Sequence, residues 1–595
     1  MDAKEQVSYW ITSFDKVLQD RDFDAVSSLF ATECYWRDLV SFTWNIKTSE
    51  GHDQIRQMLR ATIDDVQPSN WTLEGEPSHS DGAIEAWFTF ETAKSRGKGH
   101  LRLKDGKAWT LLTTMVELKG FEEAKGVARP KGVEHGPQKG RQTWKESREQ
   151  EQKTLGYTEQ PFVVIVGGGQ AGIILGARLR KLGVPTIIVE KNPRPGDSWR
   201  NRYKGLCLHD PVWYDHLPYM PFPEDWPVFT PKDKLGDWLE MYAKVMELNY
   251  WGSTTCNKAS FNEKRQEWEV TVEREGRELI LRPKELVIAL GISGYPNVPD
   301  IAGADSFEGD QFHTSKFPGA ENYRDKKAVV LGSSNSAHDI CAALWEQDVD
   351  TTMIQRSSTH VAPSDSFMEL VMGGLYSEQA LANGINHHMA DLIAASVPYR
   401  LMPALQIPIY EEMKERNAAF YDRLEKAGFL LDFGADGSGL FMKYLRRGSG
   451  FYIDVGTSEL VANGDIKLKS GVTIKQIKPK GVVLTDGTEL DADLIVYATG
   501  YDSMNKWVAD LISQDVADRL GKVWGLGSDT PKDPGPWEGE LRNMWKPTQV
   551  PHLWVQGGNL HQNRHYSQFL GLQLKARYEC ISTPVYGLEP VYHPR

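Results

Sequence analysis

Paired cysteines are missing from this sequence. Its 595 residues include 5 cysteines, at Cys34, Cys207, Cys256, Cys341 and Cys580. None forms a C-x-x-C pair or shows a metal-ligand spacing, which argues against a dithiol redox centre, predicts no metal site and favours a reducing compartment. No apolar run of about 18 residues occurs, and the first ten residues lack a basic start and an apolar stretch. We therefore expect a cytoplasmic protein without a membrane span.

Runs of basic residues are also missing. The net charge is -13 and is spread along the chain without blocks of one sign. This pattern argues against nucleic acid or an anionic membrane as a partner. Apolar residues make up 40% and charged residues 25%, the ordinary balance of a soluble globular protein. The length predicts about three or four domains.

The first 124 residues carry the pattern of an α+β module. Apolar residues from Val7 to Phe30 recur at the spacing of two amphipathic helices, and residues 48–63 show a third helical pattern. Residues 83–93 and 97–118 alternate as antiparallel strands do, with a turn at Asp105-Gly106. Helices followed by a curved sheet predict a small cone. This order resembles the nuclear transport factor 2-like fold of ketosteroid isomerases, and a module of this kind suggests a homodimer.

Asp38 is the candidate functional residue of this module. An acid inside an apolar cone can act as a proton-shuttling base, which would suit an isomerase. The alternative that we favour is a structural or dimerising module in which Asp38 and Arg37 form an ion pair. The neighbouring aromatic residues Trp36, Phe42 and Trp44 are expected in the core rather than around a ligand.

A first glycine-rich loop follows a polar linker at residues 125–160. The apolar strand beginning at Phe162 leads into Gly167, Gly169 and Gly172 in G-x-G-x-x-G spacing, and a helical pattern follows. Gly167 permits a tight turn, Gly169 lets backbone N–H groups approach a pyrophosphate, and Gly172 allows helix and strand to pack closely. The next strand ends at Glu190, which would accept hydrogen bonds from ribose hydroxyls. We predict an ADP-containing cofactor; the alternative is a glycine-rich turn without a ligand.

A second, glycine-poor loop repeats the arrangement. A strand from Lys326 leads into Gly332, and serine or alanine takes the other two glycine positions; Ser334 and Ser336 belong to this loop. The following strand ends at Arg356 rather than at an acid, and a guanidinium suits a 2′-phosphate. The two loops together predict FAD and NADPH as cofactors. Taken alone, the second loop is also consistent with an ordinary βαβ turn that carries a surface arginine and binds no ligand.

Five separated stretches resemble flavin-containing monooxygenases, closest to the indole-3-pyruvate monooxygenase-like branch, over Pro161 to Arg577. The residues from Phe307 to Phe317 fit the fingerprint F-x-G-x-x-x-H-x-x-x-[Y/F]. The other stretches are residues 196–223, which contain Trp199 and Arg202 as flavin-side residues, and residues 451–468, 497–503 and 551–577. Phe317 precedes Pro318, which is similar to Baeyer–Villiger monooxygenases, so ketone oxygenation stays open as an alternative.

The resemblance implies an α/β fold with two interleaved Rossmann-like dinucleotide-binding domains after the α+β cone. We expect an FAD-binding domain at residues 161–325 and 491–595, and an NADPH-binding domain with a helical pocket insertion at residues 326–490. The implied reaction is monooxygenation: NADPH reduces the flavin, O2 adds to give a C4a-(hydro)peroxyflavin, and one oxygen atom enters a small organic substrate. The reaction would be N- or S-oxygenation or oxidative decarboxylation of a keto acid.

Three candidate catalytic residues come from this resemblance. His313 of the fingerprint is expected to help couple the two dinucleotide domains rather than to act as the base. His209 stands where animal members carry an active-site asparagine. Asn335 would hold the nicotinamide side by amide hydrogen bonds, with capping of the following helix as the alternative. Gly557 and Gly558 would let backbone approach the isoalloxazine ring, or simply form a strand-to-helix turn.

Two other functions use the same pair of loops. A flavin disulfide reductase shares both dinucleotide folds but needs the paired thiol that is missing here. A dinucleotide sensor without catalysis, with the cone as its interaction surface, is the alternative from another class.

Overall fold

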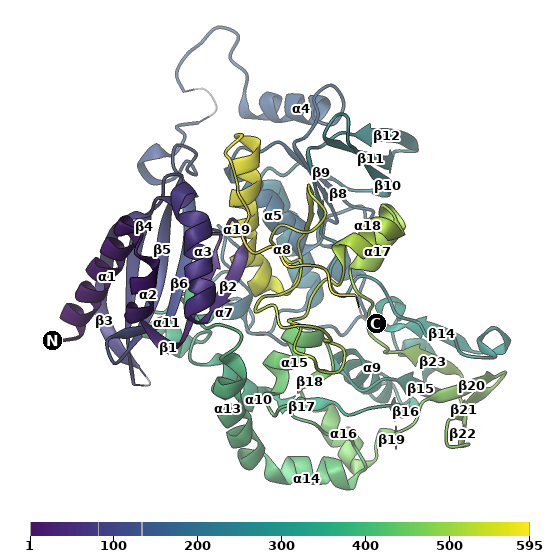
Figure 1. The fold of residues 1–595 in the computed structure, drawn as a ribbon. Coiled ribbons are helices and arrows are strands. Elements are labelled where there is room, and N and C mark those ends of the chain that lie inside the picture. The colour runs from purple at the N-terminus through teal and green to yellow at the C-terminus, as the bar shows by residue number, and fades with distance from the viewer. Residues whose placement is uncertain (1, 81, 133–134, 594–595) are drawn as a thin grey trace.

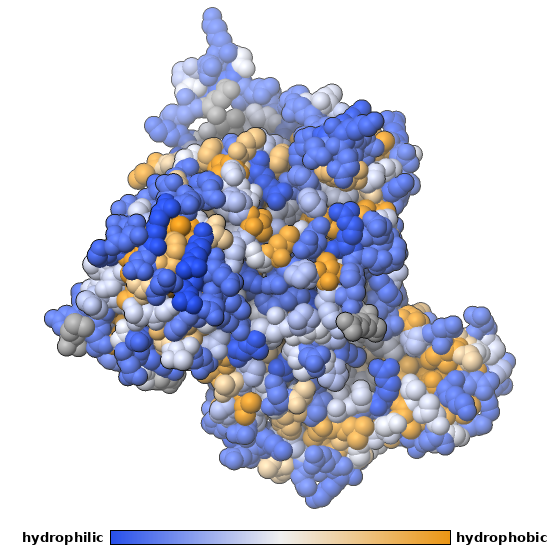
Figure 2. Space-filling view, in the orientation of Figure 1, coloured by the Kyte–Doolittle hydropathy of each residue, from blue (hydrophilic) through white to orange (hydrophobic). Residues whose placement is uncertain are grey.

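The computed structural model describes residues 2–80, 82–132 and 135–593. The chain forms an α+β unit, two parallel α/β sheets and a helical region beside the second sheet (Figure 1). The fold class is therefore the predicted one. None of the helices in these ranges is both long and apolar enough to cross a membrane. The face drawn in Figure 2 is mostly hydrophilic, with apolar side chains scattered among the polar ones.

Three helices cover one face of a six-stranded mixed sheet in the N-terminal unit. Its strand order is β2-β1-β6-β5-β4-β3, with β1 and β6 parallel and the other neighbours antiparallel. Trp10, Phe14, Trp36 and Phe42 fill the space between sheet and helices. The predicted helices, strands and hairpin are confirmed. The bounds are α1 (Ala3–Asp20), α2 (Phe23–Leu29), β1 (Phe30–Leu39), β2 (Ile46–Glu50), α3 (Gly51–Val66), β3 (Ser69–Ser80), β4 (Ala83–Glu91), β5 (Ser95–Lys104) and β6 (Lys107–Leu118).

The predicted ion pair between Arg37 and Asp38 is wrong. Neighbouring residues of a strand point to opposite faces of the sheet, and these two lie next to each other in β1. Asp38 faces the inside of the unit, where it accepts hydrogen bonds from the Phe42 amide (2.9 Å) and the Thr113 hydroxyl (2.6 Å). Arg37 points the other way and pairs with Glu540 at 2.7 Å. The pair therefore joins the unit to the rest of the chain.

The polar linker contains a helix that its low hydrophobicity concealed. A short turn, η1 (Gly126–Ala128), precedes α4 (Trp144–Thr154). Thr143 and Glu146 form a reciprocal capping box at the start of α4, which accounts for a helix among so few apolar residues. Glu151 of α4 forms an ion pair with Arg180 at 2.5 Å. Arg180 belongs to the helix that follows the first glycine loop, so α4 lies against the first parallel α/β layer.

The first parallel sheet has the order β24-β13-β7-β8-β9. The last helix, α19, packs beside α5 and runs between this sheet and the N-terminal unit (Figure 1). A three-stranded antiparallel sheet, β10-β11-β12, lies between β9 and β13 in sequence. The bounds are β7 (Val163–Val166), α5 (Gln170–Lys181), β8 (Thr186–Val189), α6 (Asp197–Arg200), α7 (Val212–Asp215), α8 (Lys232–Val245), β9 (Tyr250–Trp251), β10 (Thr254–Asn262), β11 (Glu267–Arg274), β12 (Arg277–Leu281), β13 (Glu285–Ile288), β24 (Leu553–Val555) and α19 (Leu560–Tyr578).

The second parallel sheet has the order β14-β23-β15-β16-β19. Two of its strands, β14 (Asp310–His313) and β23 (Leu494–Tyr497), lie outside residues 326–490, the range expected for the NADPH-binding domain. The other bounds are η2 (Ala304–Ser306), η3 (Thr314–Lys316), η4 (Glu321–Tyr323), β15 (Lys327–Leu331), α9 (Asn335–Trp345), β16 (Asp350–Gln355), β19 (Lys467–Ser470), and the antiparallel strands β20 (Ile474–Lys478), β21 (Gly481–Leu484) and β22 (Glu489–Asp491).

Helices fill the chain between β16 and β19 and between β23 and β24. A short parallel pair of strands, β17 with β18, forms a separate two-stranded sheet within the first group. The bounds are β17 (His360–Pro363), α10 (Ser364–Phe367), η5 (Met368–Met372), α11 (Glu378–Ala382), α12 (His387–Ala395), α13 (Met402–Arg416), α14 (Ala418–Lys426), α15 (Gly439–Arg447), β18 (Phe451–Asp454), α16 (Thr457–Asn463), α17 (Asn505–Leu511) and α18 (Gln514–Leu520).

Candidate functional site

One cavity of about 1030 Å³ is lined by both glycine loops. It lies where the carboxyl ends of β7 and β15 meet the helices that follow them, which is where open α/β sheets bind ligands. The predicted site residues that line it are Gly167, Gly169, Glu190, Trp199, Arg202, His209, Gly332, Ser334, Asn335, Ser336, Arg356, Gly557 and Gly558. Gly172 and His313 lie behind this wall.

The glycines of the first loop serve two purposes. Gly167 has a φ of 113°, and a Cβ on Gly172 would lie 2.0 Å from the Gly167 carbonyl oxygen, so both positions are restricted by the protein's own backbone. Gly169 differs, because a Cβ there would meet nothing closer than the Ser198 hydroxyl at 3.5 Å. Gly169 is also the N-cap of α5. Its missing side chain leaves the positive end of that helix open to the cavity.

Glu190 is held against the first loop by backbone donors. Its carboxylate accepts a hydrogen bond from the Gly168 amide at 2.7 Å and another from the Asn192 amide at 2.8 Å. The Tyr250 hydroxyl donates to the Gly168 carbonyl at 3.1 Å. The acid therefore sits at the rim of the loop and lines the cavity.

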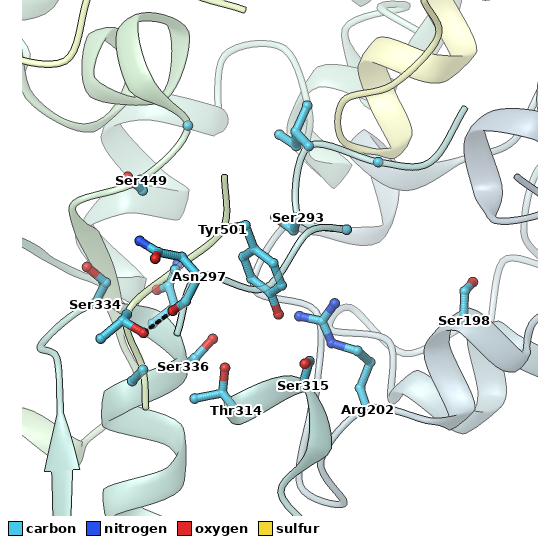
Figure 3. A pocket seen from close by; sticks show the side chains of 18 of the residues that line it. Ser198, Arg202, Ser293, Asn297, Thr314, Ser315, Ser334, Ser336, Ser449 and Tyr501 are labelled. Atoms are coloured by element: carbon cyan, nitrogen blue, oxygen red, sulfur yellow. Dashed lines mark hydrogen bonds between the residues drawn. The ribbon is translucent and has the colours of Figure 1, made fainter. Parts of the chain in front are cut away.

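Buried polar atoms face the middle of the cavity without partners. Arg202 points its guanidinium toward Tyr501, whose ring centre lies 5.6 Å away, and Trp199 donates to Gln170 at 3.1 Å (Figure 3). Within the described ranges, Arg202 Nε, the Tyr501 hydroxyl and the Ser198 hydroxyl have no hydrogen-bond partner. Buried donors of this kind are normally satisfied, so the cavity fits a polar, anionic ligand such as a dinucleotide.

The second loop has the same arrangement as the first, but only one of its positions, Gly332, requires a glycine. Gly332 has a φ of 137°, and a Cβ there would lie 2.3 Å from the Ala498 carbonyl oxygen. Ser334 and Ser336 lie on the side of the cavity opposite Ser198 (Figure 3). Asn335 accepts a hydrogen bond from the Ile453 amide at 3.1 Å, while Ser334 is the N-cap of α9. The alternative that Asn335 caps this helix is therefore wrong.

Arg356 belongs to a cluster of three cations on the cavity wall. Arg447 at the end of α15 and Lys532 in the loop after α18 line the cavity with it. Burial lowers the pKa of Lys532, and the positive charges of Arg447 and Arg356 lower it further. Three cations that repel one another suit a multiply charged anion. Sequence reasoning missed Arg447 and Lys532, because neither lies near a dinucleotide motif.

His313 joins two strands instead of facing the cavity. Its Nε2 donates to the Gly500 carbonyl at 3.0 Å, and its Nδ1 accepts from the Ser315 amide at 3.2 Å. Burial lowers its pKa, so the neutral ring is favoured. These bonds tie the end of β14 to the turn after β23. Its neighbours Thr314 and Ser315 line the cavity, and His313 itself does not.

The turn before α19 brings backbone to the cavity. Gly558 has a φ of 105°, and Asn559 caps α19 in a capping box with Gln562. Of the helical insertion between β16 and β19, only residues 357–359, Tyr444 and residues 447–451 line the cavity. The helices α12, α13 and α14 in its middle do not line the cavity.

Comparisons with known proteins agree with this geometry. A family model described as pyridine nucleotide-disulphide oxidoreductase matches residues 164–391. Indole-3-pyruvate monooxygenase YUCCA1 of Oryza sativa subsp. japonica is 30% identical over 365 residues, which cover 61% of this chain and 82% of that protein. The probable indole-3-pyruvate monooxygenase YUCCA10 of Arabidopsis thaliana is 28% identical over 355 residues, covering 59% of this chain and 84% of that protein.

Solved structures show the same fold. OTEMO in complex with FAD and NADP has a TM-score of 0.51 and 19% identity, covering 71% of this chain and 86% of that chain. Cyclohexanone monooxygenase from Rhodococcus sp. Phi1 bound to NADP+ has a TM-score of 0.50 and 18% identity, covering 70% of this chain and 84% of that chain. Together with the two loops and their shared cavity, these likenesses establish that the chain belongs to the flavin-containing monooxygenase family and is an FAD- and NADPH-dependent monooxygenase.

Proposed function

We propose that this enzyme inserts one oxygen atom into a small organic substrate inside the cavity that the two loops share. The reaction consumes O2, NADPH and a proton, and releases the oxygenated substrate, NADP+ and water. When bound, the two cofactors supply the electrons and activate the oxygen. The observation that supports the proposal is that one cavity is lined by both loops.

Each loop has a part in holding a cofactor. Gly169 and the start of α5 would receive the FAD pyrophosphate, with Glu190 near the ribose. Ser334, Ser336 and the start of α9 would receive the NADPH pyrophosphate. The cluster of Arg356, Arg447 and Lys532 would bind the 2′-phosphate, because all three cations line the same cavity. Trp199 and Arg202 would lie on the flavin side.

The other predicted residues would position the reacting groups. His313 would hold the edge strand β14 of the second sheet in place, because it ties β14 to the turn after the neighbouring strand β23. Asn335 accepts a hydrogen bond from β18 with its amide oxygen, and its amide nitrogen would face the nicotinamide. His209 and the Gly557-Gly558 turn would border the flavin ring. Exclusion of water once the cofactors and the substrate fill the cavity would protect the activated oxygen.

The role of the N-terminal unit is also part of the proposal. Its likeness to the nuclear transport factor 2-like fold is supported by three helices on one face of a curved mixed sheet. The face that carries Arg37 contacts the rest of the same chain, so a homodimer would have to use another face. The filled interior, with Trp36 and Asp38 both fully bonded inside, favours a structural role over isomerase catalysis.

The proposal is tested by product analysis under ¹⁸O2. The purified enzyme, loaded with FAD and given NADPH, is incubated with a panel of amines, thioethers, keto acids and ketones, beginning with the indole-3-pyruvate named for the relatives. We expect one labelled oxygen atom in the product of one class. An N- or S-oxide, a decarboxylated acid and an ester distinguish the three reaction types. NADPH consumption that yields only hydrogen peroxide with every class would contradict the proposal.

A further inference from the structure

The N-terminal unit turns the outer face of its sheet toward the rest of the chain. Arg37 on β1 and Arg102 on β5 lie on this face, opposite to that of Asp38, and both are buried. Burying a guanidinium group is costly unless hydrogen-bond acceptors satisfy it. The acceptors of these two arginines therefore show which part of the chain the unit holds.

Both arginines donate to the C-terminal end of α12. Arg37 Nη1 donates to the Ala395 carbonyl at 2.9 Å. Arg102 pairs through Nε with Glu85 of its own unit, and its two other nitrogens donate to the Ser396 carbonyl at 3.0 Å and hydroxyl at 2.8 Å. Ser396 is the C-cap of α12. Positive charge stabilises the end of a helix where carbonyl groups lack partners, so the unit fixes the position of this end.

A buried ion pair links α12 to α19. Asp391 lies one turn before Ala395 on α12 and is buried. It accepts hydrogen bonds from Arg564 Nε at 2.8 Å and Nη2 at 2.6 Å, and from the Tyr376 hydroxyl at 3.0 Å. A pair with two parallel bonds fixes the relative orientation of its partners. A shift of α12 would therefore move Arg564 or break the pair.

Arg564 connects this pair to a wall of the cavity. Its remaining nitrogen, Nη1, donates to the carbonyl groups of Tyr214 and His216, both at 2.7 Å. These residues flank Asp215, the last residue of α7, which lines the cavity. The Tyr214 hydroxyl accepts a hydrogen bond from Asn559 at 3.2 Å, and Asn559 lines the cavity as well. One guanidinium group thus holds the backbone of the α7 wall from behind.

We propose that Arg37 and Arg102 are positioning residues: through α12 and its ion pair with α19, the N-terminal unit holds the α7 wall of the cavity in place. The inference rests on the proposed monooxygenation and gives the unit a part in it. Asn559 follows the Gly557-Gly558 turn, so the α7 wall lies at the end of the cavity where the flavin ring would react. A small displacement of groups that position a substrate lowers the rate by a large factor. The series of bonds ends on α7 rather than on the glycine loops, so cofactor binding should not depend on it.

The first test is amide hydrogen exchange of the FAD-loaded enzyme, which needs no substrate. In Arg102→Ala we expect the amides of residues 212–216 to exchange about threefold faster or more, because their support opens more often. The first glycine loop should exchange as in wild type. Arg96→Ala is the matched control, since Arg96 lies on the same strand but is exposed and pairs with Glu117 and Glu122; it should change neither region. Faster exchange confined to the N-terminal unit and α12 would overturn the inference.

The second test is the fate of NADPH when phenylethylamine, thioanisole, indole-3-pyruvate and cyclohexanone are offered as probes. Arg102→Ala should keep its FAD content and its KM for NADPH, and raise KM for the oxygenated probe about tenfold. More of the NADPH should then react with O2 and a proton to give NADP+ and hydrogen peroxide. Arg102→Lys keeps a charge at the end of α12 and should recover part of the loss. Ser396→Ala removes a single bond and makes the same test if Arg102→Ala does not fold.

The outcomes separate this inference from the proposed function. Loss of FAD from a folded Arg102→Ala enzyme, or an unchanged KM and product yield, would overturn the inference and leave the monooxygenase proposal standing. Oxygenation of no probe by the wild-type enzyme would contradict the proposed function. Hydrogen exchange of the α7 wall would still decide whether the N-terminal unit holds it.

Discussion

Single residues decide which groups reach the cavity. The first glycine loop shows this most clearly. A side chain at Gly167 or Gly172 would clash with or strain the protein's own backbone, whereas a side chain at Gly169 would enter the open space at the start of α5. These local constraints were predictable from the G-x-G-x-x-G spacing. The cavity positions of Asp215, Arg447 and Lys532 were not, because they depend on how α7, α15 and the loop after α18 fold against the two sheets.

Gly169→Asp should abolish FAD retention. The new carboxylate would occupy the open space at the start of α5 and repel the pyrophosphate. The flavin content of the purified variant is read from its absorbance. Gly205→Asp is the matched control, since a Cβ there meets nothing within 4 Å and Gly205 lies outside the cavity lining. A Gly169→Asp protein that still carries stoichiometric FAD would show that the first loop does not bind the cofactor.

Arg356→Ala should weaken the use of NADPH far more than that of NADH. Loss of one charge-assisted hydrogen bond to a phosphate raises KM by roughly ten- to hundredfold, and NADH has no 2′-phosphate to lose. Lys532→Ala is expected to have the same selective effect, because it belongs to the same cation cluster. The measurement is KM for both coenzymes. An equal rise for NADH and NADPH would refute the assignment of this cluster to the phosphate.

At the scale of elements, regular patterns were predictable and weak ones were not. The amphipathic helices of the N-terminal unit and the hairpin at Asp105-Gly106 followed from periodicity. The helix α4 was missed because its apolar content is low, although Thr143 and Glu146 carried a capping-box signal. The ion pair of Arg37 with Asp38 was wrong because the alternation of a strand separates them. The partner of Arg37, Glu540, is too distant in sequence to be found by pattern.

Arg37→Ala should weaken the attachment of the N-terminal unit to the rest of the chain. Arg37 and Glu540 are 1% and 2% exposed, and Arg37 also donates to the Ala395 carbonyl at 2.9 Å and the Tyr566 hydroxyl at 3.0 Å. Removing one partner of a buried ion pair costs about 3–5 kcal/mol, because the other charge stays buried. We expect a lower Tm and faster proteolysis between the unit and the dinucleotide sheets.

The control for Arg37→Ala is Arg60→Ala, whose ion pair with Asp24 is exposed on the surface. It should leave Tm unchanged. The double variant Arg37→Met with Glu540→Leu removes both buried charges and should recover part of the loss. A Tm for Arg37→Ala equal to that of wild type would mean that this pair does not hold the unit in place.

At the scale of the whole molecule, buried histidines should make the fold sensitive to acid. Burial lowers the pKa of His338 and of His360 to about 4, whereas the unfolded chain binds protons at about 6.5. Between these values the unfolded state holds more protons, so the free energy of unfolding falls as pH falls, by about 1.4 kcal/mol per pH unit for each histidine. The urea midpoint at pH 7.5 and pH 5.5 measures this effect.

His338→Asn isolates one of these contributions. The amide can still donate to the Ser334 carbonyl, which His338 contacts at 3.2 Å, but it does not titrate. The variant should lose less stability than wild type when pH falls from 7.5 to 5.5. Equal losses in both proteins would show that His338 titrates alike in the folded and unfolded states.

The arrangement of both cofactors in one cavity is the claim on which the whole account depends. The measurement that tests it most directly is the visible spectrum of the purified protein in an anaerobic cuvette, before and after one equivalent of NADPH and again after air is admitted. We predict a yellow flavoprotein that NADPH bleaches, faster than NADH does, and that air restores. A protein that stays colourless after reconstitution with FAD, or a bound flavin that NADPH cannot reduce, would contradict the account.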